Sequence, residues 1–298
     1  MSIDPEYERE YSPSAWSKRY GNMEVQSKFL QLAHKVTSEM RKKIPCQLDI
    51  PYGSSDRMKY DIYGTDLPND TISGTPVFVF IHGGYWQECS KEFAGFGISA
   101  LVAEGIKVIN VGYDLCPTVK LSDVVTQIKI VTEEILKLCK KNGAKCVWLG
   151  GHSAGAHLAA SLLHDLEWRT LMTERNLFQS LKGLVLIGGI YTLRPLLKTS
   201  YNGPLQLTED EIQKFSFNDV DTRKLPPVEG IKVIVAVGEC DAPKFIEESR
   251  HYTQQLLNFV DRVEYILLRN NIDHFDIVEN LPDPRFLLTK SIIDNIKQ

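Results

Sequence analysis

One serine lies in a setting that favours chemistry. Gly151–Gly155 (GHSAG) places Ser153 between glycines, directly after the apolar run Val147–Leu149 and before a stretch that predicts a helix from Ala156. A serine on a sharp strand-to-helix turn needs small neighbours, and this pattern presents its hydroxyl as a nucleophile. The following helix directs its amide end toward developing negative charge. A glycine-rich turn with an incidental serine is the alternative, and the flanking strand and helix favour the nucleophile.

A serine hydroxyl is a weak nucleophile unless a base lies within hydrogen-bond reach. Of the seven histidines, only His251 and His274 follow a plausible acid in the chain. His251 lies inside the amphipathic stretch Phe245–Phe259, which predicts a position on a helix surface. His274 lies in a loop after the last clear apolar run, where open parallel sheets place their sites. The sequence therefore predicts His274 as the base.

The acid should lie at the end of another strand, upstream of the base. The run Val233–Val237 leads into a loop that offers Glu239 and Asp241. Asp241 lies further out and precedes a predicted helix start, so it is favoured over Glu239 as the carboxylate that orients the histidine. Asp273 is adjacent to the base in sequence and would struggle to reach back to its ring.

A second glycine motif, His82–Trp86 (HGGYW), follows the apolar run Val77–Ile81. Acyl transfer needs donors aimed at the developing oxyanion, each worth roughly 3 kcal/mol. Because glycine has no Cβ, the amides of Gly83 and Gly84 can approach closely. With the amide of Ala154 they form the predicted oxyanion hole. An ordinary glycine turn is the alternative, and the position upstream of the serine motif argues against it.

These motifs need a scaffold in which strands and helices alternate. After Pro76, short runs rich in Val and Ile alternate with helix-length amphipathic stretches such as Val124–Leu138. Strands buried on both faces appear as continuous apolar runs, and helices carry the crossovers between them. The sequence predicts an α/β protein with a mostly parallel sheet of about eight strands. The clear runs are Val77–Ile81, Val108–Val111, Val147–Leu149, Leu184–Ile187, Val233–Val237 and Val263–Leu268.

Three segments depart from this alternation within what we expect to be a single domain, residues 1–298. Residues 1–45 predict an N-terminal arm and a helix, and Cys46–Pro51 with Met58–Tyr63 predicts a hairpin. Residues 191–227 are polar and proline-rich, with a Thr208/Glu211 capping box at a short helix. Long connections inside compact domains are usually functional, so this segment is predicted to be a cap or lid.

Composition argues against several classes of protein. The 298 residues carry a net charge of −4 without a basic block, which argues against nucleic-acid binding. No apolar stretch approaches the roughly 20 residues of a membrane span, and no signal peptide is apparent. The six cysteines form no CxxC pair, which predicts reduced thiols in the cytoplasm. No carboxylate is spaced to complete a metal site with His152, His157 and His164, so no metal is predicted.

Together, these motifs resemble one family. His82–Trp86 resembles the HGGxW motif of the kynurenine formamidases (arylformamidases), whereas related lipases and esterases usually carry a third glycine at the position of Tyr85. The resemblance covers nearly the whole chain. Its other segments are Tyr11–Ser14, Gly151–Leu158, Tyr201–Leu205, Gly238–Asp241 and Asp273–Asp276.

The resemblance implies an α/β-hydrolase fold with Ser153 as nucleophile, Asp241 as acid and His274 as base. It further implies hydrolysis of N-formyl-L-kynurenine to L-kynurenine and formate without a cofactor, and commonly a homodimer. Tyr85 and Trp86 are the candidates for the wall beside the substrate, and the sequence leaves open whether one ring or both face it. The main rival is a general carboxylesterase or lipase-like hydrolase of small aryl esters. A non-catalytic binding protein on this fold would typically lack a triad member, and all three are present.

Overall fold

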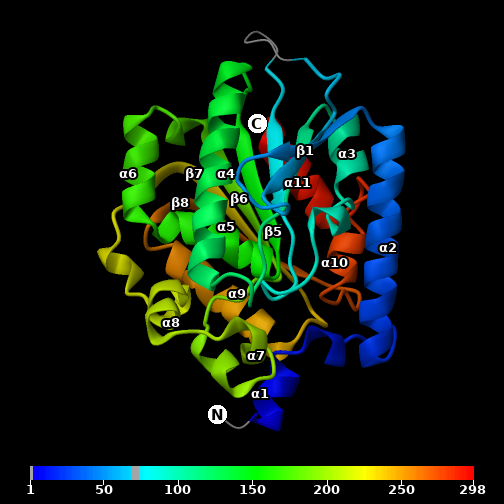
Figure 1. Cartoon of the computed structure of the whole chain (residues 1–298), viewed down its shortest axis with the longest axis vertical. Helices are drawn as coiled ribbons and strands as arrows, with labels where there is room; N and C mark the ends of the chain where they lie inside the picture. Colours follow the sequence, from blue (N-terminus) through cyan, green and yellow to red (C-terminus); the bar gives the residue numbers. More distant parts are fainter. Residues whose placement is uncertain (1–2, 69–73) are drawn as a thin grey trace.

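The apolar runs and the hairpin form one sheet in the computed structural model, which describes residues 3–68 and 74–298 (Figure 1). Its strands are β1 (Cys46–Pro51), β2 (Lys59–Tyr63), β3 (Val77–Ile81), β4 (Lys107–Val111), β5 (Val147–His152), β6 (Leu181–Ile187), β7 (Val228–Gly238) and β8 (Val260–Leu268). Their order across the described sheet is β1-β2-β4-β3-β5-β6-β7-β8. Strand β2 is antiparallel to both its neighbours, and the remaining pairs are parallel. The predicted sheet is confirmed.

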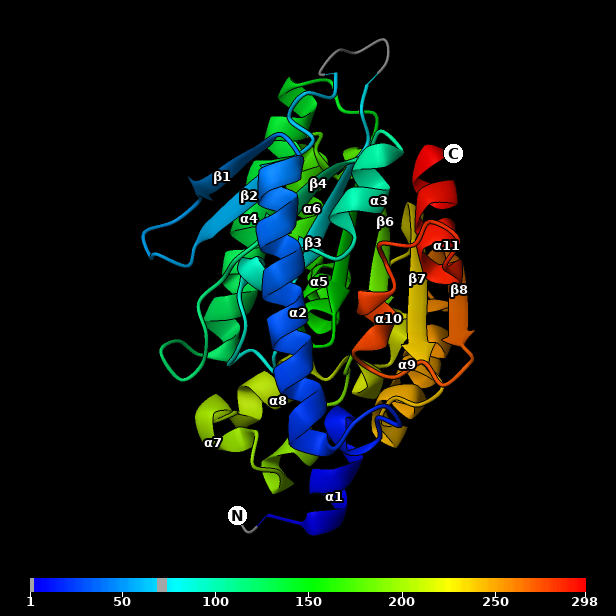
Figure 2. The ribbon, with the colours of Figure 1, turned by 90° about the vertical axis from the view of Figure 1, so that its right-hand side faces the viewer.

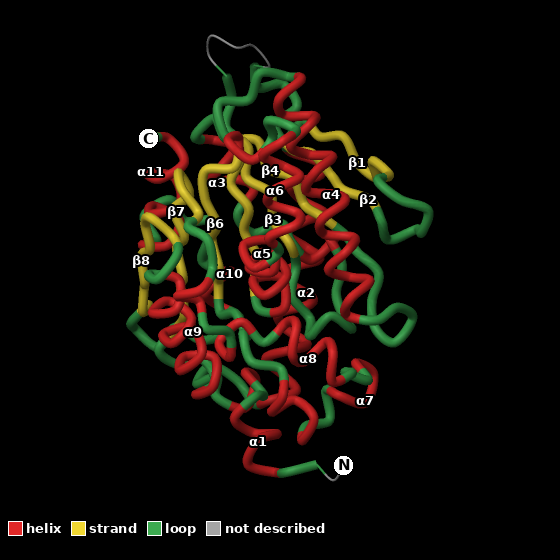
Figure 3. Tube along the Cα trace, turned by 90° about the vertical axis from the view of Figure 1, so that its left-hand side faces the viewer, coloured by secondary structure: helices red, strands yellow, loops and turns green. Residues whose placement is uncertain are grey.

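Helices cover both faces of this sheet, because alternate strand residues point to opposite sides. Val79 and Leu149 pack with α4, α5 and α9 on one face, whereas Phe78 and Ile234 pack with α2, α3, α10 and α11 on the other. Figures 2 and 3 show these two faces. The α-helices are α1 (Pro5–Glu10), α2 (Asn22–Lys43), α3 (Ile98–Ala103), α4 (Leu121–Lys141), α5 (Ala154–His164), α6 (Leu166–Glu174), α7 (Asn202–Leu205), α8 (Glu209–Phe215), α9 (Pro243–Leu256), α10 (Asp276–Glu279) and α11 (Leu287–Lys297).

Several elements are longer than their apolar cores predicted. Strand β7 begins at Val228 rather than Val233, and its Lys232 still pairs with Arg262 of β8. Backbone groups form the ladder, so polar residues at a strand end can continue it without an apolar pattern.

The predicted capping box is present: Thr208 Oγ1 accepts from the Glu211 amide at 3.2 Å, and Glu211 accepts from the Thr208 amide at 3.1 Å.

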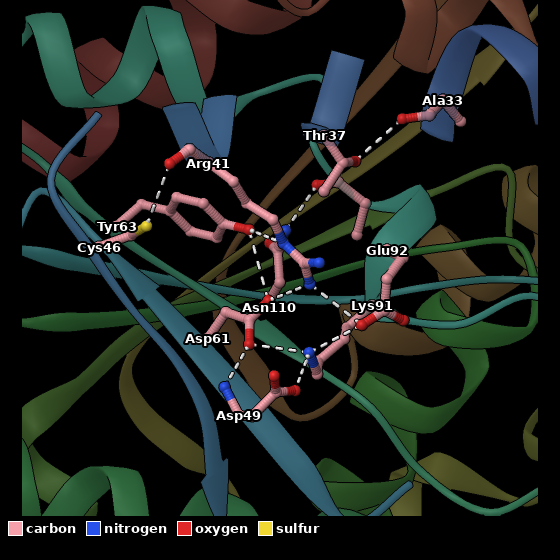
Figure 4. A network of polar contacts seen from close by, with 11 residues as sticks. Ala33, Thr37, Arg41, Cys46, Asp49, Asp61, Tyr63, Lys91, Glu92 and Asn110 are labelled. Carbon is pink, nitrogen blue, oxygen red and sulfur yellow. Dashed lines mark hydrogen bonds and ion pairs between the residues drawn. The ribbon is translucent and has the colours of Figure 1, made fainter. Parts of the chain in front are cut away.

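A buried carboxylate ties the second helix to the edge of the sheet. Asp61 of β2 is fully buried and lies 2.8 Å from both Lys91 Nζ and Arg41 Nη2 (Figure 4). Lys91 opens a short 3₁₀ helix, η2 (Lys91–Phe93), and also contacts Glu92 at 2.8 Å. A buried charge is tolerated only when it is paired and hydrogen-bonded, and this network meets that need. It therefore anchors the chain just beyond the HGGYW loop.

The N-terminal arm is tied to the segment that joins β6 to β7. Glu8 of α1 accepts hydrogen bonds from the amide and hydroxyl of Ser200, at 2.7 and 2.6 Å. The Asp4 amide donates to the Lys198 carbonyl at 2.8 Å. Both segments lie at the end of the molecule toward which β7 and β8 point (Figure 2). The arm and residues 191–227 thus cover the carboxyl ends of the strands, and a lid role for 191–227 stays a prediction.

Candidate active site

Ser153 occupies a strained turn between β5 and α5. Its backbone has φ 57° and ψ −122°, a conformation that non-glycine residues rarely adopt. The turn fits only because its flanking residues are glycines: a Cβ on Gly155 would lie 2.1 Å from the Ile81 carbonyl oxygen. A Cβ on Gly151 would lie 2.2 Å from the Gly155 oxygen. The observed strand, turn and helix are the context in which this motif presents a nucleophile.

Asp241 and His274 form a buried pair beyond the ends of β7 and β8. Asp241 Oδ2 lies 2.8 Å from His274 Nδ1, and both side chains are buried. The other carboxylate oxygen accepts from the Ala242 amide at 2.6 Å. Gly188, with φ 52°, leaves room for the pair, since a Cβ there would lie 3.1 Å from His274 Nδ1. A histidine held in this way keeps its proton on Nδ1 and leaves Nε2 to accept one.

The other candidate carboxylates point elsewhere. Glu239 accepts from the Asn271 amide at 2.8 Å and lies 3.4 Å from the guanidinium of Arg269. Asp273 accepts from the Phe275 amide and forms an ion pair with Arg19 at 2.9 Å. Both oxygens of Asp273 are therefore engaged by groups other than the His274 ring. Of the three acids weighed from the sequence, the structure places Asp241 against His274.

The HGGYW loop lies against the serine turn. A Cβ on Gly83 would lie 3.0 Å from Ser153 Cβ, so the two backbones are in close contact. No backbone hydrogen bond among the described residues uses the amide of Gly83 or Gly84 as donor. Ala154 is the first residue of α5, where an amide has no partner within the helix. The amides of Gly83 and Gly84 thus have no backbone acceptor among the described residues, and the oxyanion hole stays a prediction.

The two aromatic residues of the loop have different surroundings. The Tyr85 ring lines the cavity described below, stacks on Tyr201 at 3.8 Å between centroids and donates its hydroxyl to the Tyr11 carbonyl. Trp86 is fully buried and packs edge-on against His157 at 4.9 Å. It is not part of the cavity wall. The sequence left open whether both rings face the site; in the structure Tyr85 lines the cavity, and Trp86, the other candidate for substrate binding, lies outside it.

A largely apolar cavity of about 210 Å³ begins at these residues. Ser153, His274 and Gly83 line it near the strand ends, and solvent-exposed Glu88 lines it as well. It continues between the sheet and the helices of the α2 face, where its walls are phenylalanine and aliphatic side chains. They include the partly buried Phe29 and the buried Phe78, Phe80, Phe96, Leu101 and Ile292. Such a cavity binds an apolar or aromatic group beside a few convergent polar atoms.

The remaining histidines near the site have structural contacts. His152 donates from Nε2 to the His274 carbonyl at 2.8 Å, which steadies the backbone of the predicted base. Burial, followed by the charge of His274, holds the pKa of His152 well below its usual value, so this ring is neutral. His251 is exposed on α9, as expected. Within residues 3–68 and 74–298, no three His, Cys, Asp or Glu side chains gather closely enough to hold a metal ion.

A buried glutamate supports the Tyr85 side of the cavity. Glu248 of α9 accepts from the Tyr11 hydroxyl at 2.7 Å and from the Thr192 amide at 2.8 Å. Tyr11 in turn receives the hydroxyl of Tyr85 at its carbonyl. Sequence reasoning missed Glu248, because a lone acid in an amphipathic helix resembles a surface residue. Its spacing from the apolar Phe245 and Tyr252, both on the buried face, was the available signal.

Burial raises the pKa of Glu248 from 4.5 to about 7, despite hydrogen bonds from the Tyr191 amide, the Tyr11 hydroxyl and the Thr192 amide that favour the charged form. The folded protein thus keeps this carboxyl protonated where the unfolded chain ionises it. Its contribution to stability is complete below pH 4.5 and is lost as the pH rises toward 7. We expect the Tm advantage of the wild type over Glu248→Gln to shrink by several degrees across that interval.

Thermal unfolding of both proteins at several pH values measures this advantage. Glu174→Gln is the matched control, since Glu174 is exposed at the end of α6. It should follow the wild-type profile throughout. A constant difference between wild type and Glu248→Gln would show that Glu248 has an ordinary pKa.

Comparison with known proteins agrees with this geometry. A family model of the alpha/beta hydrolase fold matches residues 78–276. Kynurenine formamidase of Danio rerio is 33% identical over 296 residues, covering 99% of this chain and 97% of the relative. Kynurenine formamidase of Salmo salar is 32% identical over 288 residues, covering 97% and 95%.

Solved structures place the same fold in esterases. Esterase B from Lactobacillus Rhamnosis superposes with a TM-score of 0.67 at 19% identity, covering 92% of this chain and 91% of that one. None of the described helices is both long and apolar enough to cross a membrane. Two relatives above 30% identity over nearly their whole length establish the relationship. The chain is a hydrolase of the kynurenine formamidase family within the α/β-hydrolase fold.

Proposed function

We propose that this protein hydrolyses N-formyl-L-kynurenine to L-kynurenine and formate, with Ser153, Asp241 and His274 as its triad. The observation that carries the proposal is the 2.8 Å contact between Asp241 and His274, at a cavity that also exposes Ser153. The relatives named kynurenine formamidase supply the substrate class. The proposal includes no cofactor.

In the proposed mechanism, His274 Nε2 takes the proton of the Ser153 hydroxyl as its oxygen attacks the formyl carbon. The amides of Gly83, Gly84 and Ala154 donate to the oxyanion of the tetrahedral intermediate. His274 then gives its proton to the arylamine nitrogen, and the C–N bond breaks to leave a formyl ester on Ser153. His274 next deprotonates a water that attacks this ester, and formate leaves as Ser153 regains its proton.

The dependence of the rate on the size of the acyl group distinguishes a formamidase from the rival proposal, a general carboxylesterase. The Tyr85 ring is held by its hydroxyl contact and by Tyr201, next to the Gly84 backbone. A formyl carbon presents only hydrogen to such a wall, whereas an acetyl group adds a methyl, and small misplacements can cost about a hundredfold. We expect kcat/KM for formanilide to exceed that for acetanilide by at least roughly 10², after correction for intrinsic reactivity.

Variants of Tyr85 and Trp86 show which of the two rings restricts the size of the acyl group. Tyr85→Ala should narrow the gap between the anilides, whereas Trp86→Ala should not, because Trp86 lies outside the cavity. Equal corrected rates for both anilides in the wild type would favour the carboxylesterase instead.

The cellular setting and assembly are part of the proposal. All six cysteines are unpaired, in agreement with a reducing compartment such as the cytoplasm. A homodimer is implied by the family resemblance and stays a prediction.

A further inference from the structure

The cavity beside Ser153 carries a single charged side chain. Among the described residues that line it, Glu88 is the only Asp, Glu, Lys or Arg. No ion pair or hydrogen bond to another described side chain or amide uses the Glu88 carboxylate. A carboxylate at an apolar cavity that no described side chain engages is available to a cation from solution.

The backbone fixes Glu88 within one turn of the proposed oxyanion hole. The amides of Gln87 and Glu88 both donate to the Gly84 carbonyl at 2.9 Å. Gly84 has φ 107°, and a Cβ there would lie 2.4 Å from the backbone carbonyl oxygen of Glu88, so the turn closes tightly. The following Cys89 carbonyl is held by the guanidinium of Arg57. The position of Glu88 relative to the reacting carbon is therefore set by the same loop that supplies the oxyanion donors.

The carboxylate also lies near the aromatic wall. Burial is the main cause that raises the pKa of the Tyr201 hydroxyl, and the charges of Glu8 and Glu88 add to it. Tyr201 stacks on Tyr85, and both rings line the same cavity as Glu88. A ligand here can place an aromatic ring on the wall and a cation at Glu88.

N-formyl-L-kynurenine has this combination of groups. Its aryl formamide carries, on the neighbouring ring carbon, a short keto side chain that ends in an ammonium and a carboxylate. Among the described residues, the cavity wall holds a carboxylate for the ammonium and no Lys or Arg for the substrate carboxylate. We propose that Glu88 binds the α-ammonium group of the substrate and so selects formamides that carry a cationic side chain. This inference rests on the proposed function and assigns the part of the site that binds the amino-acid side chain of the substrate.

The test compares two amides on wild type and Glu88→Gln. N-formyl-L-kynurenine carries the ammonium, whereas ortho-acetylformanilide keeps the aryl formamide and ketone without it. We expect Glu88→Gln to raise KM for N-formyl-L-kynurenine about tenfold and to leave kcat within about twofold, the loss of one partly solvated charged contact. Both constants for ortho-acetylformanilide should stay unchanged. Added salt should raise KM for the first amide only, since exposed charges are screened.

Two controls keep the result specific. Glu174→Gln changes the net charge equally at an exposed position of α6 and should alter neither amide. Glu88→Asp should keep part of the selectivity, because it retains the charge. Equal losses on both amides, or no loss on either, would overturn the role of Glu88. A wild type that hydrolyses neither amide would instead overturn the proposed function.

Discussion

Ser153→Ala or His274→Ala should each lower kcat by roughly 10⁴ to 10⁶, and the double variant should be little worse than either. Nucleophile and base act in the same step, so once one of them is lost, substituting the other lowers kcat little further. The geometry supports this, since both side chains line one cavity and His274 is held by Asp241 at 2.8 Å. Purified variants assayed at saturating substrate give the comparison.

Matched substitutions outside the cavity separate chemistry from folding. Ser161 lies on α5, the helix that follows the serine turn, and its hydroxyl donates to the Leu158 carbonyl at 2.7 Å. His251 is exposed on α9. Ser161→Ala and His251→Ala should keep kcat within about threefold of the wild type. Losses that multiply in the double variant would mean that Ser153 or His274 has been assigned the wrong role.

Asp241→Asn should cost on the order of 10⁴ in kcat, because the amide selects the wrong tautomer of His274. Asp241 Oδ1 accepts from the Ala242 amide at 2.6 Å, so an asparagine keeps its oxygen there. Its NH₂ group then faces His274 Nδ1 and forces the ring proton onto Nε2. That nitrogen can no longer accept the serine proton, although the size of the side chain is unchanged.

Glu239→Gln is the control for this substitution and should cost less than about tenfold. Glu239 lies on the same loop, yet its carboxylate contacts Arg269 and the Asn271 amide. The same kinetic assay serves for both variants. The reverse order of effects would make Glu239 the acid and contradict the structural assignment.

The sequence predicted the features that depend on residue type and local backbone geometry. A Cβ on Gly151 or Gly155 would lie 2.2 or 2.1 Å from a backbone carbonyl oxygen, so only glycine fits at either position and the turn around Ser153 could be predicted from residue types alone. The choice of Asp241 over Glu239 rested on loop position, and the structure explains it by the contact to His274. Apolar runs located the strands because burial on both faces favours apolar residues at most of their central positions.

The contacts that join distant segments could not be predicted in this way. Tyr85 and Trp86 are adjacent, and both have positive φ, so no simple alternation tells which ring faces the cavity. Tyr85 is directed there by the Tyr11 carbonyl and the Tyr201 ring, which come from segments far away in the chain. The buried position of Glu248 depends on the same tertiary packing, which no local pattern encodes.

Turnover of N-formyl-L-kynurenine by the purified protein tests the proposed activity directly. The expected result is L-kynurenine, followed by its absorbance, with one formate for each molecule formed. Ser153→Ala should abolish the signal under the same conditions. If the wild type leaves N-formyl-L-kynurenine intact while hydrolysing small aryl esters through Ser153, the protein is an esterase on this scaffold and the formamidase proposal is wrong.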